Sequence, residues 1–522
     1  MKNNYKALFN TDRHMLFLIG KSLLIGILVG VAVVAYRWIL ATFEALSIQM
    51  YDFLSTHSIG AFLLFPALIL AGYGIGLLIK KYPLIGGSGI PQVKGIMLGH
   101  LKNAWVSTLF AKFFGGAICI LAGLSLGREG PSIQLGACVA DGIAQKYGKT
   151  RMERKFLMAS GASAGLAAAF NAPLAGVMFT LEEIFKYFSP SILLSTMTAA
   201  VTSDFVSKNV FGLQPVFHFP IEKSMPLSSY WILILLGIVL GIAGAFYNWF
   251  LLETQKWYKK IDLLPAASRP AIAFIIAGFF GLFFPIVLGG GHKIVPQLTP
   301  ESGIVFLLML LVLKFIFSMI SFGCGAPGGI FFPLLIMGAC IGAIFGNVAV
   351  NFLGFSDIFF YNFIILAMAG YFTAIVRAPI TGVVLIVEMT GSFSHMLALT
   401  VVSLVAYVVA DLLKSRPIYD SLLKNLLKSH SLSPYEEDNS VKITMEFIVQ
   451  FHSTADGSQV RDITWPSGCL LIAVKREGSE IIPKGHTKIL AGDYLVCLAP
   501  INEETKIRTH LLRLTESSEH SI

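Results

Sequence analysis

Long apolar segments alternate with short polar stretches over most of this chain. The first apolar run, Met15 to Ala35, is long enough to cross a bilayer as a helix, and the polar opening before it does not resemble a cleavable signal peptide. Similar segments continue to about Leu427. Of the 522 residues, 55% are hydrophobic and only 13% are charged. This pattern excludes a soluble globule and predicts an all-α polytopic membrane protein.

The pattern changes near residue 430. A polar stretch at 429–440 reads as a linker, and shorter alternating segments follow it. We expect strands at 442–450, 469–474, 480–483 and 493–498, a turn at 477–478 and a terminal helix at 503–514. The predicted organisation is therefore a membrane domain at 1–428, a linker at 429–440 and a small α+β domain at 441–522.

Several apolar runs of the membrane region are too short to span and are interrupted by Gly, Pro or Ser. Irregular backbone at membrane depth is tolerated only where it is buried in protein or lines an aqueous cavity. The interruptions therefore predict broken helices around an internal site. They lie at 86–91, 127–131, 171–173, 289–291 and 325–333.

These interruptions recur at an interval of about 200 residues, which indicates a duplicated half. The segment 172–177 matches 378–383, and in both a glutamate follows nine residues after the proline. The halves would extend over about 15–210 and 225–425. Paired broken helices in two halves point to a transport site at their interface, near the middle of the membrane.

Glu129 lies in the segment 127–131, between two apolar runs. An ionisable group at membrane depth is costly, so its default interpretation is an ion pathway, a proton relay or a counter-ion. The flanking glycines and Pro131 end one helix and begin another. A helix N-terminus at this point would present backbone N–H groups to an anion. One short motif thus offers a titratable acid beside an anion site.

The net charge of +9 does not indicate a nucleic-acid partner, because basic residues cluster between apolar segments. Anionic lipid or cytoplasm is the expected neighbour of such clusters. The clusters lie at 80–81, 149–155, 256–260 and 414–416. Six cysteines without a CxxC pair indicate neither a disulfide framework nor a metal site.

Four motifs follow one another along the chain: GSGIP at 87–91, GREGP at 127–131, GIFFP at 329–333, and Tyr419 after Arg416-Pro417. In this order they resemble the CLC family of chloride channels and chloride/proton antiporters, and the segment 161–183 is also typical of that family. The resemblance covers about residues 15–425. It implies two inverted halves with many tilted and broken helices, and a homodimer with one pore per subunit.

The resemblance implies a central chloride site formed by the hydroxyl groups of Ser88 and Tyr419 and the backbone N–H groups of Ile330 and Phe331. Chloride is large and weakly hydrated, so partial charges can hold it without a full cation. A buried Lys or Arg would bind it too tightly for turnover. Serine at position 88, where nitrate-preferring relatives have proline, favours chloride.

The resemblance also implies an outer anion site, formed by the N–H groups around Arg128 to Gly130 and those of Phe331 and Phe332. Glu129 would be the gating glutamate, which occupies this site when ionised and leaves it when protonated. A purely structural ion pair with a basic neighbour is the alternative for Glu129. We expect Arg128 mainly to buttress the loop.

The resemblance further implies that Glu183 occupies the position of the internal proton-transfer glutamate that many antiporters of the family carry. An ordinary acid at a helix end is the alternative for Glu183. Its neighbour Glu182 matches Glu388 in the second half, which favours a helix-packing role for that pair. The chain is then predicted to exchange chloride for protons as a secondary transporter, without a cofactor and without being an enzyme. A passive voltage- or pH-gated chloride channel of the same fold is the alternative.

The tail at 441–500 resembles the TrkA-C regulatory module of potassium-uptake and potassium-channel proteins. Such modules often dimerise and bind a small ligand or ion, and a simple stabilising appendage is the alternative. This tail favours a prokaryotic source. We expect a multi-pass protein of the inner or plasma membrane, with cytoplasmic termini and a cytoplasmic C-terminal domain.

Other classes fit the sequence less well. The residues 86–89 match the GxSG of intramembrane serine proteases, but the histidines fall at segment edges or in Gly-rich turns (His100, His292 and His395). The sequence contains no GxxxxGK[ST] motif, the phosphate-binding loop that a nucleotide-driven pump would need. A cation transporter contradicts the predicted anion-binding helix N-termini.

Overall fold

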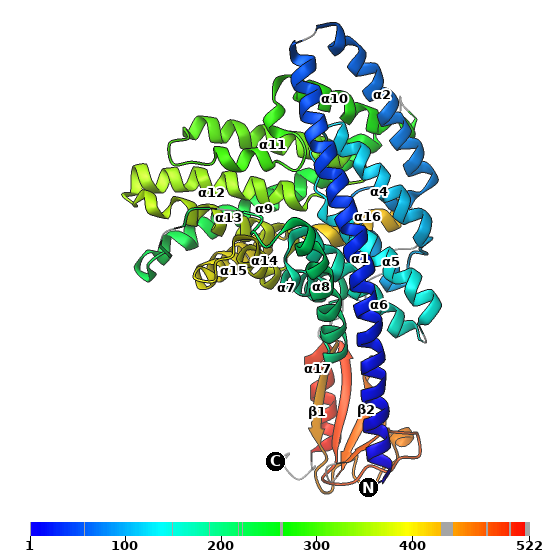
Figure 1. The fold of residues 1–522 in the computed structure, drawn as a ribbon. Helices are drawn as coiled ribbons and strands as arrows, with labels where there is room; N and C mark the ends of the chain where they lie inside the picture. Colours follow the sequence, from blue (N-terminus) through cyan, green and yellow to red (C-terminus); the bar gives the residue numbers. More distant parts are fainter. Residues whose placement is uncertain are drawn as a thin grey trace. The chain divides into compact units, whose positions relative to one another are not determined.

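The computed structural model folds into two compact units, Met1–His430 and Ser431–Ile522 (Figure 1). It describes residues 2–56, 58–148, 150–186, 188–217, 219–221, 223–261, 265–429, 442–476, 479–500 and 503–516, with side chains described outside 2–14 and 58–62. The predicted linker, apart from Ser429, and the predicted turn at 477–478 lie outside the described residues.

The first unit is helical, as the apolar segments predict. Among the described residues, seven helices are long and apolar enough to cross a membrane, judged by length and composition. The first half contains α1 (Lys2–Thr56), α2 (Ser58–Lys81), α3 (Ile90–Leu98), α4 (Trp105–Leu121), α5 (Glu129–Tyr147), α6 (Arg151–Phe170), α7 (Pro173–Phe179), the π-helical η2 (Thr180–Phe185) and α8 (Pro190–Phe211). The second contains α9 (Tyr230–Lys259), α10 (Arg269–Phe283), the 3-10 helix η6 (His292–Gln297), α11 (Ile304–Gly323), α12 (Phe331–Leu353), α13 (Phe360–Val376), α14 (Pro379–Thr390), α15 (Met396–Leu412) and α16 (Ile418–Ser429).

The two halves pack in the same way. In the first half α1 lies against α6 and α8, and α5 lies against α6; in the second, α9 lies against α13 and α15, and α12 against α13 (Figure 1). The predicted fold of two related halves with broken helices is therefore confirmed.

Contacts between the halves are reciprocal. The backbone N–H of Gly87 donates to Gly325 O at 3.1 Å, and that of Gly289 donates to Gly123 O at 3.3 Å. Gly289 follows Gly87 by the same sequence interval that separates Gly325 from Gly123. Exchanging the halves thus turns one contact into the other, which is the property of a two-fold axis.

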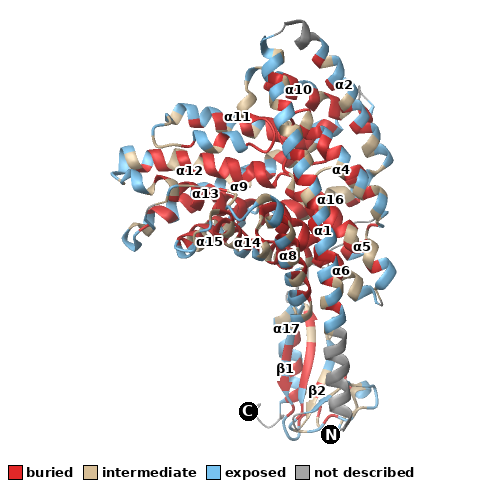
Figure 2. Ribbon diagram, viewed as in Figure 1, coloured by how far each residue is buried: buried red, intermediate tan, exposed pale blue. Residues whose placement is uncertain are grey.

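Small residues bring the innermost helices close together. A side chain at Gly136 of α5 would lie 2.1 Å from Gly161 O of α6, and one at Gly165 would lie 2.2 Å from Ser132 O. Small residues at helix interfaces let membrane helices approach backbone to backbone. Figure 2 shows the result in the second half, where α12 and α13 are buried over most of their length.

The second unit is a small α+β domain, as predicted. Its antiparallel sheet has the strand order β1-β4-β2-β3, and Ile507 and Leu511 of its helix are buried in the core beside the sheet. The predicted strands and helix are found within a few residues of their expected bounds. The elements are β1 (Lys442–Ile448), β2 (Leu470–Arg476), β3 (Ser479–Ile481), β4 (Tyr494–Pro500) and α17 (Glu504–Thr515).

Candidate functional site

Two glycine loops, one from each half, cross at the centre of the first unit. Gly127 N–H donates to Gly329 O at 2.7 Å, and Gly329 N–H donates to Gly127 O at 2.8 Å. Because α5 begins two residues after Gly127 and α12 two residues after Gly329, the N-termini of both helices meet here. Two helix dipoles therefore place partial positive charge at one point, which favours an anion.

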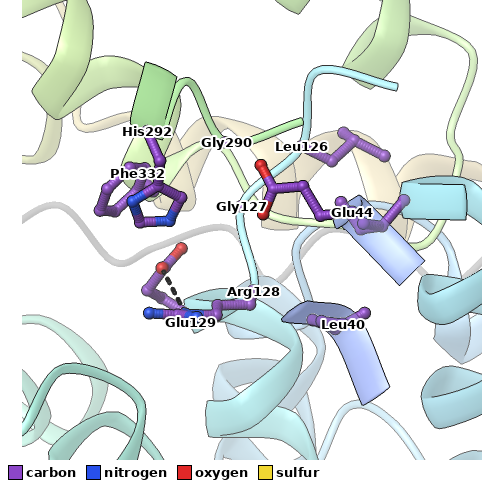
Figure 3. A pocket seen from close by; sticks show the side chains of 10 residues that line it. Leu40, Glu44, Leu126, Gly127, Arg128, Glu129, Gly290, His292 and Phe332 are labelled. Atoms are coloured by element: carbon purple, nitrogen blue, oxygen red, sulfur yellow. Dashed lines mark ion pairs between the residues drawn. The ribbon is translucent and has the colours of Figure 1, made fainter. Parts of the chain in front are cut away.

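Glu129 is the first residue of α5 and is fully buried. Among the described residues, neither of its carboxylate oxygens has a hydrogen-bond partner of standard geometry. The nearest cation is that of Arg128, whose Nε lies 3.8 Å from Glu129 Oε1. Figure 3 shows the carboxylate pointing toward His292 and Phe332. A buried acid with so few partners is costly to keep ionised.

The carboxylate occupies the region predicted for the outer anion site. A side chain built at Gly127 would lie 2.5 Å from Glu129 Oε2 and 3.1 Å from the backbone nitrogen of Phe332. The carboxylate and the α12 N-terminus thus share one small space, which only glycine at position 127 leaves open.

A cavity of about 20 Å³ lies beside Glu129, which is room for about one water molecule. Glu44 of α1 and His292 of η6 join Arg128 and Phe332 in its wall (Figure 3). The His292 and Phe332 rings lie 4.1 Å apart between centroids. Both Glu44 and His292 are polar groups at the cavity for which the sequence analysis predicted no role there.

Ser88 and Tyr419 are buried hydroxyl residues at 2% and 0% exposure. Within the described part of the chain, neither Ser88 Oγ nor the Tyr419 hydroxyl has a hydrogen-bond partner. Buried polar groups are normally paired, so each unpaired hydroxyl is a candidate contact for a ligand. Gly130 lets Ser88 approach α5, because a side chain there would lie 2.5 Å from Ser88 Oγ.

Aromatic contacts connect the predicted central residues. The ring of Phe179 lies 5.7 Å from that of Phe331 and 6.1 Å from that of Tyr419, both edge-on. Phe331 begins α12, and Ile330 before it caps that helix. The structure therefore brings Phe331 and Tyr419 against the same side chain, that of Phe179.

Glu183 belongs to a separate polar cluster. It is 2% exposed and accepts a hydrogen bond from Lys94 Nζ at 3.1 Å. Lys94 also contacts Asp420 Oδ1, and Asp420 Oδ2 lies 2.7 Å from Lys186 Nζ. Glu183 lies in the π-helical segment η2. Short π-helical segments are frequently found at functional sites.

Glu182 points away from this cluster and has the packing role that its match to Glu388 predicts. Its two oxygens accept the N–H groups of Ile380 and Thr381 at 3.2 and 2.8 Å. Glu388 accepts those of Leu174 and Ala175 at 3.1 and 2.8 Å. Each carboxylate thus caps the first turn of the matching helix in the other half.

Two lysines with no exposed surface, Lys112 and Lys314, were missed by the sequence analysis, which placed basic residues between apolar segments. Lys112 Nζ donates to the carbonyl oxygens of Ile85 and Gly87 at 2.8 and 2.5 Å, and Lys314 Nζ donates to the equivalent pair in the second half at 2.9 and 2.8 Å. Both lysines are 0% exposed. The rule that singled out Glu129, an ionisable residue inside an apolar segment, also applies to them.

The structure thus brings some of the predicted site residues together. Arg128, Glu129 and Phe332 line the outer cavity. Ser88 lies against Gly130, Phe331 and Tyr419 both lie against Phe179, and Glu183 lies in its own charged cluster. In the part of the chain that the structure describes, no group of three or more His, Cys, Asp or Glu side chains could hold a metal ion.

Known proteins resemble both units of this chain. The family model described as voltage gated chloride channel matches residues 67–411, and the TrkA-C domain model matches residues 444–511. The H(+)/Cl(-) exchange transporter ClcA of Vibrio cholerae serotype O1 (strain M66-2) is 35% identical over 444 residues, covering 82% of this chain and 93% of that protein. ClcA of Salmonella typhimurium (strain LT2) is 30% identical, covering 84% of this chain and 95% of its own.

Solved structures show the same likeness. The crystal structure of a slow cyanobacterial Cl⁻/H⁺ antiporter has a TM-score of 0.74 and 28% identity, covering 79% of this chain and 99% of its own. A eukaryotic CLC transporter has a TM-score of 0.66 at 21% identity, covering 78% of this chain and 74% of its own, and it supports the fold alone.

Proposed function

Because this chain belongs to the voltage gated chloride channel family, we propose that it exchanges chloride for protons across the membrane as a secondary transporter. The observation that carries the proposal is the buried Glu129 carboxylate, which lacks hydrogen-bond partners among the described residues and lies where the N-termini of α5 and α12 meet. The exchange activities named for the relatives from Vibrio cholerae and a cyanobacterium support it.

Chloride binding rests on partial charges. The unpaired hydroxyls of Ser88 and Tyr419, with the N–H groups of Ile330 and Phe331, would hold the ion at the central position. Such donors replace part of the hydration shell, yet none is a full cation in direct contact. Binding is then strong enough for entry and weak enough for release, which transport requires.

Glu129 would couple proton and chloride movement, because its carboxylate and chloride compete for the outer anion position. When ionised, its carboxylate lies beside the Phe332 amide and fills the outer anion position. A proton removes the negative charge and with it the attraction to the helix N-termini, so the side chain leaves and chloride enters. One protonation event thus opens the outer anion position.

Glu183 would supply protons from the other side. Its carboxylate is buried, and its charge is held by Lys94. It lies four residues after Phe179, whose ring contacts Tyr419. The proton route and the chloride route would therefore be separate at Glu183 and would converge near the central site.

The test uses purified protein in liposomes. A chloride gradient is imposed while a potassium ionophore clamps the voltage, and the external pH is followed. Protons that move uphill, opposite to chloride, support the exchanger. Chloride flux without proton movement would make the protein a passive channel of the same fold, and the proposal would be wrong.

The tail and the assembly extend the proposal. Ile448, Leu470 and Tyr494 are exposed on the sheet face opposite the domain core. Exposed apolar groups gathered on one face indicate a binding surface. We therefore expect this domain to lie in the cytoplasm and to associate with a second copy in a homodimer. A ligand of the domain stays a prediction from its family.

A further inference from the structure

The ammonium group of Lys94 has an unusual position in the first unit. Lys94 is 5% exposed and lies on α3, six residues after the predicted chloride ligand Ser88. It binds the Glu183 carboxylate at 3.1 Å and also contacts Asp420. Asp420 directly follows Tyr419, the other hydroxyl ligand, at the start of α16.

One cation therefore joins the three segments that matter for exchange. These are α3, which follows Ser88; η2, which carries Glu183; and α16, which carries Tyr419. The helix packing agrees, since α3 lies against both α16 and η2. In the part of the chain that the structure describes, the ion pairs of Lys94 are those with Glu183 and Asp420.

The charges of this cluster balance only when Glu183 is ionised. Lys94 and Lys186 then face Glu183 and Asp420, two cations against two anions. The other helices packed on α3 are α5 and α6. Of their carboxylates, Glu129 lies at the outer cavity, and Asp141 and Glu153 are paired with Arg154 and Lys21.

We propose that Lys94 is a positioning residue that transmits the protonation of Glu183 to the chloride site through Asp420. When Glu183 takes up a proton, Lys94 loses one of its two partners and Asp420 becomes its sole anionic partner. A buried charge follows its remaining partner, because an unpaired one is costly. The pull acts on Asp420, and Tyr419 moves with it, so a proton on Glu183 strengthens chloride binding.

This inference rests on the proposed function and extends it. In the proposed function, protons and chloride compete at Glu129. In this inference, protonation of Glu183 also changes chloride binding at the central site. The link is reciprocal, since a proton that strengthens chloride binding must itself be bound more tightly when chloride is present.

The test measures chloride binding to the purified full-length protein by isothermal titration calorimetry. Glu183→Gln represents the protonated acid, and it should strengthen chloride binding about fivefold or more. The Asp420→Asn substitution removes the ion pair between Lys94 and α16. In that background, Glu183→Gln should alter chloride binding less than about twofold. Lys94→Met should remove the response in the same way.

Asp420→Asn is the decisive background because it leaves the Lys94–Glu183 pair intact. If the charge of Lys94 acted only through space, Glu183→Gln would strengthen binding equally in both backgrounds, which would overturn the inference. Lys21→Met is the matched control, since it removes the cation of another part-buried ion pair of this unit. There the full response to Glu183→Gln should persist.

The two levels of the proposal fail differently. A wild-type protein that binds no chloride would overturn the proposed function and this inference with it. A wild-type protein that binds chloride and exchanges it for protons, but whose response to Glu183→Gln survives in Asp420→Asn, would overturn only the link through Lys94.

Discussion

Glu129 and Glu183 are both buried carboxylates, but their surroundings suit them to different tasks. Neither oxygen of Glu129 has a hydrogen-bond partner of standard geometry in the described part of the chain, and a cavity lies next to the carboxylate. Glu183 is held by the ammonium group of Lys94. These surroundings fit the proposed roles, in which Glu129 leaves its place and Glu183 stays and passes a proton.

We expect Glu129→Gln to abolish proton coupling while chloride still moves. Glutamine has nearly the size of glutamate but cannot titrate, and without a negative charge it no longer competes with chloride for the helix N-termini. The measurement is the liposome assay, with chloride efflux and external pH recorded together. Proton uptake equal to that of wild-type protein would show that another group carries the proton.

Glu183→Gln should also stop proton movement, but for a different reason: the internal donor is lost, while the outer gate remains titratable. Some chloride flux should persist, and it should still depend on external pH through Glu129. The same assay, repeated at two external pH values, distinguishes this variant from Glu129→Gln. Normal proton transport by Glu183→Gln would refute the proposed proton route.

Lys112 and Lys314 are suited to a matched pair of substitutions, because each donates hydrogen bonds to the backbone of an equivalent loop in its own half. Lys112 binds the carbonyl of Gly87, directly before Ser88, whereas Lys314 binds that of Gly289, next to the outer cavity. Either lysine, changed to methionine, leaves two buried carbonyl groups without their donor. Such a loss typically costs about 1–3 kcal/mol per group.

We therefore expect both Lys112→Met and Lys314→Met to lower the thermal unfolding temperature in detergent. Only Lys112→Met should also weaken chloride binding measured by calorimetry, because only its loop leads into Ser88. Equal loss of chloride binding in both variants would mean that the positive charges act at long range rather than through the loop.

At the scale of elements, the two halves are joined by exchanged helix caps. Pro173 and Pro379 begin α7 and α14, so the first free N–H groups of each helix follow directly. A glutamate from the opposite half accepts these groups. This arrangement needs no cation, and it satisfies backbone donors that a broken membrane helix would otherwise leave unpaired.

Glu182→Gln and Glu388→Gln should each destabilise the protein by about 0.5–2 kcal/mol, the usual effect of losing a helix cap. Glutamine keeps one acceptor oxygen but loses the second and the negative charge. Thermal unfolding checks the stability, and the ratio of protons to chloride should stay at the wild-type value in both variants. A changed ratio in Glu182→Gln alone would place Glu182 on the proton route.

Much of this architecture could be predicted from the sequence because glycine and proline act locally. Where glycine and proline cluster they frequently end a helix, so the breaks before α3, α5, α7, α12 and α14 were expected. The π-helical turn at η2 was not predicted, because α14 shares the pattern of α7 yet continues as a regular helix past Glu388. The two segments differ at this point in sequence, because the counterpart of Glu183 in α14 is Met389.

The charged cluster could not be predicted for a related reason. Lys94 lies in a short helix and Asp420 far away in sequence, and only the folded unit brings them to Glu183. Local pattern contains no information on which distant residues meet. The resemblance to a known family supplied Ser88, Tyr419 and Glu183 but no role for Lys94.

At the scale of the whole molecule, the residues proposed for exchange all lie in one unit. The positions from Ser88 to Tyr419 belong to Met1–His430, and the hydrophobic core of the second unit is formed by its own residues. Neither the chloride ligands nor the two proton-carrying glutamates need the tail for their geometry.

We therefore expect a protein that ends after His430 to fold, to insert and to exchange protons for chloride at the wild-type ratio. The same truncation removes the exposed sheet face that carries Leu470 and Tyr494, so any association through the tail is lost. Light scattering of both proteins in detergent shows whether the membrane unit remains dimeric without it. An unchanged ratio with an altered turnover rate would assign the tail a regulatory role, because the site itself would be intact. A changed ratio would instead mean that the tail helps to set the site, contrary to the separation of the two cores.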